Sequence, residues 1–327
     1  MFPPRLHLAN LPTPLVPLDR LSAKTGGPRI WLKRDDLTDT TASGNKLRKL
    51  EFSLGQALAD SADLVITCGG TQSNHCRATA TMAAQLGLRC HLLLRGREPE
   101  TADGNLLLDQ LLGAQITFLD AARYEQLAVE VDQLTESYAR QGIRAYYIPV
   151  GASDEVGLWG YAEAANELKA DFSRLDIDPV AVVSAAGSGG TLGGLIAGKA
   201  LYNLKPEMLA YNVCDDADWF INKIEADLNK WQHRYQQPIT IERQAINVTD
   251  GFVGPGYARA EPKVFSRIRE VAQLEGVIFD PVYTGKAFDA MLTEIQAGRF
   301  DGASDIVFLH TGGLFGIFPQ KSSFPLD

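Results

Sequence analysis

The sequence has no excess of basic residues and no long apolar run. Its 31 Lys and Arg face 40 Asp and Glu, a formal net charge of −9, so nucleic acid is not an expected partner, because phosphate binding needs a basic surface. No segment approaches the ~18 to 20 consecutive apolar residues that cross a bilayer, and no membrane partner is expected. Residues 1–20 contain five prolines and no continuous apolar segment, which does not match a secretory signal peptide. We therefore expect a cytoplasmic protein whose Pro-rich start is an extended surface arm.

Cysteine and histidine are also scarce. The four cysteines, Cys68, Cys76, Cys90 and Cys214, form no Cys-x-x-Cys pair, and only Cys76 and Cys90 have a histidine beside them. Neither a zinc site nor a disulfide framework is predicted, and we expect no metal. Free, mostly buried thiols in a reducing compartment are expected instead.

Apolar segments of strand length alternate with segments of helix length. This alternation predicts an α/β fold of parallel sheets flanked by helices. Several strands are apolar throughout, so both of their faces are expected to be covered. The predicted strands are residues 29–33, 64–67, 89–94, 115–119, 145–148, 180–184, 209–213 and 306–310. The predicted helices are residues 45–59, 74–86, 105–112, 124–141, 158–168, 191–202, 219–235, 262–275 and 285–296.

The length of 327 residues predicts two domains, because a single core stops growing near this size. No linker marks the boundary. The continuous alternation of strands and helices up to residue 168, followed by a Gly-rich restart at Gly187, predicts a smaller α/β unit inserted in a larger one. We place the larger domain at residues 1–47 plus 162–327 and the smaller at residues 48–161.

Two polar clusters precede helices in the first half of the chain. In Ser43-Gly44-Asn45-Lys46-Leu47-Arg48-Lys49, the lysine at a helix start among other cations favours an uncharged amine, which is the form that acts as a nucleophile. A solvated basic helix face is the alternative. In Cys68-Gly69-Gly70-Thr71-Gln72-Ser73-Asn74-His75, the carboxyl end of a parallel strand meets a helix, where α/β proteins bind ligands. A simple N-cap is the alternative there.

A glycine-rich turn, Gly187-Ser188-Gly189-Gly190-Thr191-Leu192-Gly193-Gly194, follows the predicted strand 180–184. Successive backbone N–H groups at a helix start form an anion cradle, so this turn predicts a phosphate site, with a purely structural turn as the alternative. Leu192 breaks a dinucleotide fingerprint, and Ala200 stands where a P-loop has Ser or Thr. A single phosphate group is therefore expected rather than a nucleotide.

Two further turns lie near the end of the chain, Asp280-Pro281-Val282-Tyr283-Thr284-Gly285-Lys286 and His310-Thr311-Gly312-Gly313. Tyr283 has a ring that stacks on a flat ligand, and Thr284 or Thr311 has a hydroxyl for a ring nitrogen. A helix start with turn glycines is the alternative for each. Taken together, the clusters contain what is needed to hold pyridoxal phosphate and a small amino-acid substrate.

The stretches SGNKLRKLEF, TQSNHCRATA, GSGGTLGG, DPVYTGK and HTGG resemble the family that contains 1-aminocyclopropane-1-carboxylate (ACC) deaminase and D-cysteine desulfhydrase, and within it the desulfhydrase branch. The likeness runs from Leu11 to about Gly316. It implies a fold-type II pyridoxal-phosphate enzyme, similar to the tryptophan synthase β chain, with the cofactor between two α/β domains. It also implies a homodimer.

The resemblance implies roles for residues around the cofactor. Lys46 would bind the cofactor covalently, and Asn74 would bond its phenolic oxygen. Lys49 and the turn from Gly187 to Thr191 would hold the phosphate, and Tyr283 would face the ring.

The resemblance also implies the substrate-contacting residues. Ser73 would contact the substrate carboxylate or act at the α or β carbon, with Asn74 and His75 beside it. Tyr257, in Gly254-Pro255-Gly256-Tyr257, matches a second active-site tyrosine, although the residues that flank it depart from the deaminase pattern.

Thr284 departs from the deaminases, whose motif resembles DPVYEGK. A glutamate beside the ring nitrogen keeps the pyridine protonated and makes a strong electron sink, which ring opening of ACC needs, whereas a hydroxyl does not. Thr311, where the deaminases resemble HLGG, points the same way. Expelling a thiolate, whose conjugate acid has a pKa of ~8.5, needs a weaker electron sink.

We therefore expect a carbon–sulfur lyase that eliminates sulfide from D-cysteine or a close analogue, giving pyruvate, ammonia and hydrogen sulfide. ACC deaminase and L-cysteate sulfo-lyase are the alternatives within the family. A nucleotide-binding protein and a catalytically silent binding module are the alternatives outside it.

Overall fold

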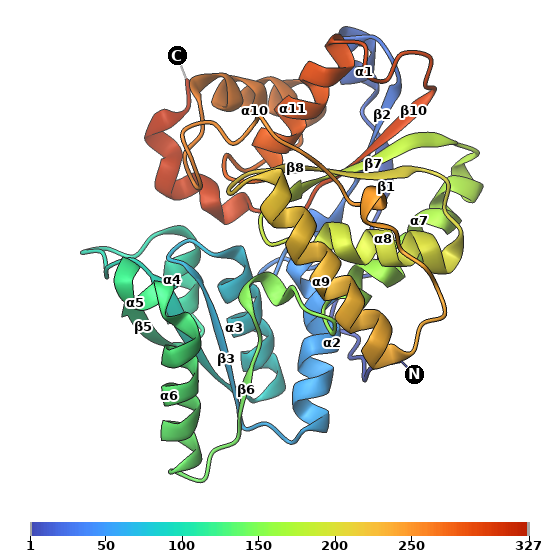
Figure 1. The fold of residues 1–327 in the computed structure, drawn as a ribbon. Coiled ribbons are helices and arrows are strands. Elements are labelled where there is room, and N and C mark those ends of the chain that lie inside the picture. Colours follow the sequence, from blue (N-terminus) through green and yellow to red (C-terminus); the bar gives the residue numbers. More distant parts are fainter. Residues whose placement is uncertain (1, 326–327) are drawn as a thin grey trace.

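The computed structural model describes residues 2–325 and contains two separate sheets (Figure 1). The larger sheet has the strand order β1-β2-β10-β7-β8-β9, and every neighbouring pair is parallel except β1 with β2. Its strands are β1 (Leu15–Pro17), β2 (Arg29–Lys33), β7 (Pro179–Ala186), β8 (Glu207–Asn212), β9 (Asn247–Thr249) and β10 (Asp305–Leu309).

The smaller sheet is parallel throughout, with the order β5-β4-β3-β6. Its strands are β3 (Leu64–Gly70), β4 (Arg89–Arg95), β5 (Gln115–Leu119) and β6 (Ala145–Tyr147). Because parallel strands need crossover connections, helices alternate with them and cover both faces of each sheet.

The helices are α1 (Asp19–Thr25), α2 (Asn45–Ala59), α3 (Asn74–Leu86), α4 (Gly104–Leu111), α5 (Ala121–Glu125), α6 (Leu127–Ala139), α7 (Leu158–Leu175), α8 (Gly190–Tyr202), α9 (Ala217–Tyr235), α10 (Pro262–Glu275) and α11 (Thr284–Gln296). Short 3₁₀ turns lie at Asp35–Leu37, Val150–Ala152, Arg243–Ala245 and Leu314–Ser323. One apolar core packs α7, α8 and α9 on one face of the larger sheet, and a second packs α10 and α11 on the other. The predicted α/β fold of parallel sheets flanked by helices is confirmed.

All four strands of the smaller sheet lie within residues 48–161, and all six of the larger sheet lie outside them. The boundaries expected at 47/48 and 161/162 therefore leave both sheets whole, and they stay a prediction. Helix α2 leaves the larger unit, packs on α3 of the smaller one, and also contacts α7. Within residues 2–325, no helix combines the length and the apolar content that a membrane span requires.

The Pro-rich start differs from the extended surface arm that its composition predicts. Leu15 to Pro17 form β1, which pairs with β2, and α1 begins at Asp19. Leu15 and Leu18 are buried in the two cores. Paired backbone and buried leucines thus override the preference of proline for extended, solvated chain.

The helix expected at 124–141 is divided in two. Asp120 accepts a hydrogen bond from the Arg123 amide at 2.9 Å, which begins α5 earlier than the apolar pattern indicates. At Gln126 the backbone leaves helical geometry, with φ −101° and ψ 28°, before α6 starts. A side-chain cap and one non-helical residue explain the difference.

Candidate active site

Three turns that are distant in the sequence meet through glycine residues. A Cβ at Gly44 would lie 2.5 Å from the Thr311 carbonyl oxygen, and one at Gly312 would lie 2.8 Å from Gly44 Cα. Gly313, with φ +109°, lies so close to Asp280 that a Cβ there would be 2.7 Å from its side chain. Only glycine combines this positive φ with such close approach. The turns at residues 43–46, 280–284 and 310–313 therefore form one locus.

Lys46 lies in the first turn of α2 at this locus. Its side chain is half-buried, and its ammonium makes no hydrogen bond or ion pair with any residue in 2–325. Burial lowers the pKa of Lys46 from 10.5 to about 8. Desolvation destabilises the charged ammonium, so the neutral amine is populated near neutral pH, as a nucleophile or base requires.

This pKa predicts the pH dependence of labelling at Lys46. Trace acetylation of the cofactor-free protein is expected to titrate with a midpoint near pH 8, because only the neutral amine reacts. At pH 7, roughly 10% of the Lys46 amine is neutral, against less than about 0.1% for a lysine of ordinary pKa. Mass spectrometry of the peptide that contains Lys46 measures the pH midpoint of its acetylation. Nα-acetyl-lysine amide in the same tube is the reference. A midpoint near that of the reference would contradict the desolvation argument.

Lys49, one turn further along α2, reaches the start of α8. Its side chain is fully buried, and Nζ lies 3.1 Å from the Gly151 carbonyl oxygen and 3.5 Å from Ser153 Oγ. Burial, reinforced by the charge of Lys46, holds the pKa of Lys49 well below its usual value. A Cβ at Gly190 would lie 2.9 Å from Lys49 Nζ. Lys49 is therefore placed directly against the glycine-rich turn.

Ser153 completes this cradle and was missed by sequence analysis. Its Oγ accepts a hydrogen bond from the Gly190 amide at 3.2 Å and pairs with Ser188 Oγ at 2.8 Å. From the other side, Asn45 Nδ2 donates to Thr191 Oγ1 at 2.9 Å. The sequence signal was present, since Gly151-Ala152-Ser153 follows β6 at the carboxyl end of the smaller sheet, where ligands bind in α/β folds.

The cradle has the chemistry to hold the phosphate of pyridoxal phosphate. The N-terminus of α8 supplies N–H donors and positive potential, and Lys49 and two serine hydroxyls surround it. Gly187, at the start of the turn, lies against the Tyr283 ring, where a Cβ would be 2.7 Å from Tyr283 Cε1. The residues present thus fit a group that carries one phosphate beside a flat ring.

Adding one methyl group to the cradle tests this fit. Gly190→Ala puts a Cβ 2.5 Å from Ser153 Oγ, and such overpacking costs about 1–3 kcal/mol. Binding of pyridoxal phosphate is expected to weaken roughly 10- to 100-fold, measured by absorbance titration of the cofactor-free protein. Gly316→Ala is the matched control, because a Cβ there meets nothing within 4 Å. Equal affinity of the two variants for pyridoxal phosphate would show that the cradle does not bind the cofactor.

Ser73 and Asn74 begin α3 at the end of β3. Ser73 is the N-cap, and its Oγ accepts from the Cys76 amide at 3.2 Å. Asn74 Oδ1 accepts from Asn105 Nδ2 at 3.0 Å and from Arg77 at 3.3 Å. Two donors on the oxygen leave the Asn74 NH₂ group free to donate to a ligand.

His75 differs from the substrate-contacting role expected of it. Its ring is buried, and Nε2 lies 2.8 Å from Thr67 Oγ1. The Thr67 hydroxyl donates its only hydrogen to the Ile148 carbonyl oxygen, so it accepts from His75 Nε2. Burial, with the charges of Lys46 and Lys49, holds the pKa of His75 well below its usual value. His75 is a neutral packing residue behind the site in this structure.

Tyr283 and Tyr257 meet across the site. Their hydroxyl groups are hydrogen-bonded, and their rings lie edge to face at 5.9 Å between centroids. A Cβ at Gly70, the end of β3, would lie 3.9 Å from the Tyr257 ring. Burial raises the pKa of Tyr257 to about 12 and that of Tyr283 well above its usual value. Both phenols are thus uncharged, and Tyr257 lies beside the end of β3 of the smaller sheet.

Thr284 and Thr311 differ in what their hydroxyls do. Thr284 is fully buried; its Oγ1 donates to Asp280 Oδ1 at 2.7 Å and accepts from the Asp280 amide at 2.9 Å. Its hydroxyl is therefore engaged within its own turn. The Thr311 hydroxyl makes no hydrogen bond with residues 2–325, while its carbonyl accepts from the Asn45 amide at 3.2 Å, next to Lys46. Thr311 is the better placed of the two to face a ring nitrogen.

Comparisons with known proteins agree with this geometry. A family model described as "Pyridoxal-phosphate dependent enzyme" matches residues 6–312. A protein named D-cysteine desulfhydrase from Klebsiella pneumoniae (strain 342) is 38% identical, covering 96% of this chain and 95% of that protein.

Two further relatives are similar over nearly the whole chain. A protein from Arabidopsis thaliana named bifunctional D-cysteine desulfhydrase/1-aminocyclopropane-1-carboxylate deaminase, mitochondrial, is 38% identical, covering 96% of this chain and 79% of that protein. A crystal structure described as that of an ACC deaminase homologue superposes with a TM-score of 0.89 and 34% identity, covering 98% of this chain and 95% of the other.

Proposed function

The chain belongs to the family of pyridoxal-phosphate dependent enzymes, and on that premise we propose that it is a carbon–sulfur lyase acting on D-cysteine or a close β-substituted amino acid. The substrate is supported by the names of the Klebsiella and Arabidopsis relatives. The overall reaction consumes one water and gives pyruvate, ammonia and hydrogen sulfide. The bonds that break are Cα–H, Cβ–S and, on hydrolysis of the released enamine, C–N.

Bound pyridoxal phosphate supplies an electron sink for the negative charge left at Cα. In this proposal Lys49, Ser153 and the α8 N-terminus hold its phosphate, since they surround the Gly190 amide. The NH₂ group of Asn74 donates to its phenolic oxygen, because Asn105 and Arg77 already occupy the Asn74 oxygen. The Tyr283 ring would lie against the flat ring of the cofactor, and Gly187 packs against Tyr283.

Lys46 Nζ is the proposed base. Its pKa of about 8 and its lack of a partner within residues 2–325 let the amine take a proton from Cα near neutral pH. It is also the proposed point of covalent attachment for the cofactor. The same neutral amine suits both tasks.

Ser73 and the first N–H groups of α3 are the proposed site for the substrate carboxylate. A helix N-terminus stabilises an anion, and the Ser73 hydroxyl has a hydrogen to donate, because its oxygen accepts from the Cys76 amide. In this proposal the amino acid binds between α3 and α2.

One observation carries the choice of elimination over ring opening. The Asp280 carboxylate, the acidic group nearest Thr284, accepts from the amides of Val282, Tyr283 and Thr284 and from the Thr284 hydroxyl. It has no capacity left for a ring nitrogen. The Thr311 hydroxyl is the proposed partner instead, and a hydroxyl supports loss of a thiolate better than loss of a carbon leaving group.

A parallel substrate assay tests the function. The loaded protein is given D-cysteine, L-cysteine, cysteate and ACC in separate tubes, and pyruvate, sulfide and 2-oxobutanoate are measured. We expect pyruvate and sulfide in equal amounts from D-cysteine. 2-Oxobutanoate from ACC, which the name of the Arabidopsis relative suggests as the second candidate, would overturn the argument from Asp280 and Thr311. Pyruvate from cysteate alone would keep the mechanism and change the substrate.

We further propose a homodimer in a reducing, cytoplasmic compartment. The four cysteines are free, and three of them are buried. Exposed apolar side chains gather on two elements that contact each other, α4 and the turn Leu314–Ser323, and a second copy would cover them. These side chains are Leu107, Leu111, Leu314 and Phe318. Sedimentation velocity measures the oligomeric state, and a monomer at micromolar concentration would contradict this part of the proposal.

A further inference from the structure

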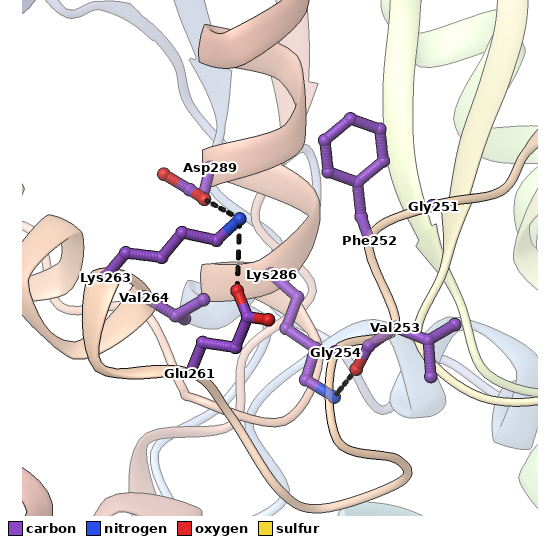
Figure 2. Close-up of a pocket in the computed structure, with 9 residues that line it drawn as sticks. All are labelled: Gly251, Phe252, Val253, Gly254, Glu261, Lys263, Val264, Lys286 and Asp289. Atoms are coloured by element: carbon purple, nitrogen blue, oxygen red, sulfur yellow. Dashed lines mark hydrogen bonds and ion pairs between the residues drawn. The ribbon is translucent and has the colours of Figure 1, made fainter.

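Lys286 makes an unusual pair of contacts for a lysine in a helix. It lies in the first turn of α11, three residues after Tyr283, and its side chain is 2% exposed. Nζ donates to the carbonyl oxygens of Val253 at 2.7 Å and Gly256 at 2.8 Å; Figure 2 shows the first of these bonds. No carboxylate pairs with Lys286 among residues 2–325, so the backbone of the loop at 250–261 is its hydrogen-bond partner.

This loop connects β9 to α10 and contains no helix or strand. Gly251, Gly254, Gly256 and Ala258 all have positive φ, so the backbone turns repeatedly without a ladder to hold it. Such a segment needs anchors from outside itself, because its own hydrogen bonds are few. Lys286 provides two such hydrogen bonds. The second is to the carbonyl oxygen of Gly256, the residue immediately before Tyr257.

Tyr257 joins this loop to the active site. Its hydroxyl is bonded to that of Tyr283, and its ring lies beside Gly70. The start of α11 thus carries both Tyr283 and Lys286. Lys286 bonds Gly256, the residue before Tyr257. The distance between the Tyr257 and Tyr283 hydroxyls therefore depends on their own hydrogen bond and on that of Lys286 to Gly256.

We propose that Lys286 is a positioning residue whose two hydrogen bonds to the loop at 250–261 hold Tyr257 against Tyr283. This rests on the proposed function, in which Tyr283 contacts the cofactor. Lys286 does not touch the reacting atoms; it acts through Tyr257.

Lys263 is a matched control on the same pocket. Figure 2 shows its ammonium between Glu261 and Asp289, and its side chain is 60% exposed. It makes no contact with the carbonyls that Lys286 holds. Removing its charge leaves both hydrogen bonds of Lys286 to the loop in place.

The first experiment measures the loop without the cofactor. In Lys286→Met, which keeps the length of the side chain and removes its donors, we expect the amides of residues 251–258 to exchange hydrogen at least about tenfold faster than in the parent or in Lys263→Met. Unchanged exchange in Lys286→Met would overturn the proposal, whatever the enzyme does with amino acids.

The second experiment measures catalysis. In the loaded Lys286→Met variant we expect kcat to fall about 10- to 100-fold and KM to change less than about threefold, with cofactor content equal to that of the parent. A parent-like kcat would overturn the proposal. If the parent itself turns over none of the four substrates, the proposed function fails while the exchange result still decides the role of Lys286.

Chemical rescue separates this role from general support of the fold. Lys286→Ala leaves space beside a pocket of about 40 Å³ lined by Val253, Gly254 and Glu261. Ammonium or methylammonium chloride is expected to restore at least about a tenth of the lost kcat, because either ion can donate to the same two carbonyls. Tetramethylammonium, which has no N–H, is expected to restore nothing. Equal effects of the three salts would contradict the positioning role.

Discussion

Replacing Lys46 with alanine is expected to lower turnover on the order of 10⁴-fold or more, because the proposed base and covalent attachment point are lost together. Borohydride treatment of the loaded variant should leave no covalent adduct, while the parent retains one on the peptide that contains Lys46. Fold stability should not suffer. In the folded chain burial lowers the Lys46 pKa to about 8, so its ammonium form penalises folding below that pH, and alanine removes the penalty.

Lys46→Arg provides a control, because it keeps a cation at the position but offers no amine that forms an imine. It should be as inactive as Lys46→Ala. Lys49→Ala is expected to behave differently: it weakens cofactor affinity, yet at saturating cofactor it retains the borohydride-stable adduct. Turnover by Lys46→Ala with D-cysteine at a rate near that of the parent would refute the assignment of Lys46.

Arg48→Met is expected to have the largest effect on stability. Arg48 is 2% exposed and bonds both oxygens of Asp35, at 2.8 Å each, and both of Glu167, at 3.0 Å each. Loss of the guanidinium leaves the buried Asp35 carboxylate without its ion-pair partner, while Glu167 keeps Lys33. Breaking a buried pair in this way costs about 3–5 kcal/mol. Thermal unfolding should shift downward by roughly 6 to 10 °C, measured by circular dichroism.

The origin of this effect is electrostatic, and two further measurements isolate it. Burial raises the pKa of Asp35, but Arg48, Tyr161 and Lys33 together outweigh burial, and the pKa lies below its usual value. The resulting stability is present at neutral pH and is lost as pH falls through the carboxyl range, so the gap between parent and variant should narrow towards about pH 4. Adding Asp35→Asn should also recover part of the loss. A constant gap, or no recovery, would indicate a packing defect instead.

Most strands were predictable from the sequence, and the two edge strands of the larger sheet were not. The strand at 29–33 has the predicted bounds, because its central apolar residues mark chain that is buried on both faces. Leu15–Pro17 and Asn247–Thr249 escaped detection. Each is three residues long and lies at an edge of the larger sheet, so neither has a strong apolar pattern. Their pairing depends on a neighbouring strand that is distant in sequence.

The site residues that could be predicted from the sequence are those in glycine-rich or polar turns after strands. Lys46, Lys49 and the turn at 187–191 meet in the structure as their chemistry predicts. Ser153 was missed although its turn follows β6 at the carboxyl end of the smaller sheet, because a lone serine after a three-residue strand is a weak signal. The engagement of Thr284 by Asp280 was also not predictable: two residues four apart share a motif in the sequence, but only the backbone path decides whether a hydroxyl faces inward or outward.

The order of strands in the larger sheet has a consequence for synthesis on the ribosome. β10, which is made last, lies between β2 and β7, with parallel pairing on both sides. Until residues 305–309 have been translated, β1-β2 and β7-β8-β9 remain two fragments with unpaired edges facing each other. Thr311 and the two glycines that join the three turns follow immediately after β10. A growing chain therefore cannot trap the cofactor early, and exposed strand edges must be protected from aggregation until residues 305–309 have been made.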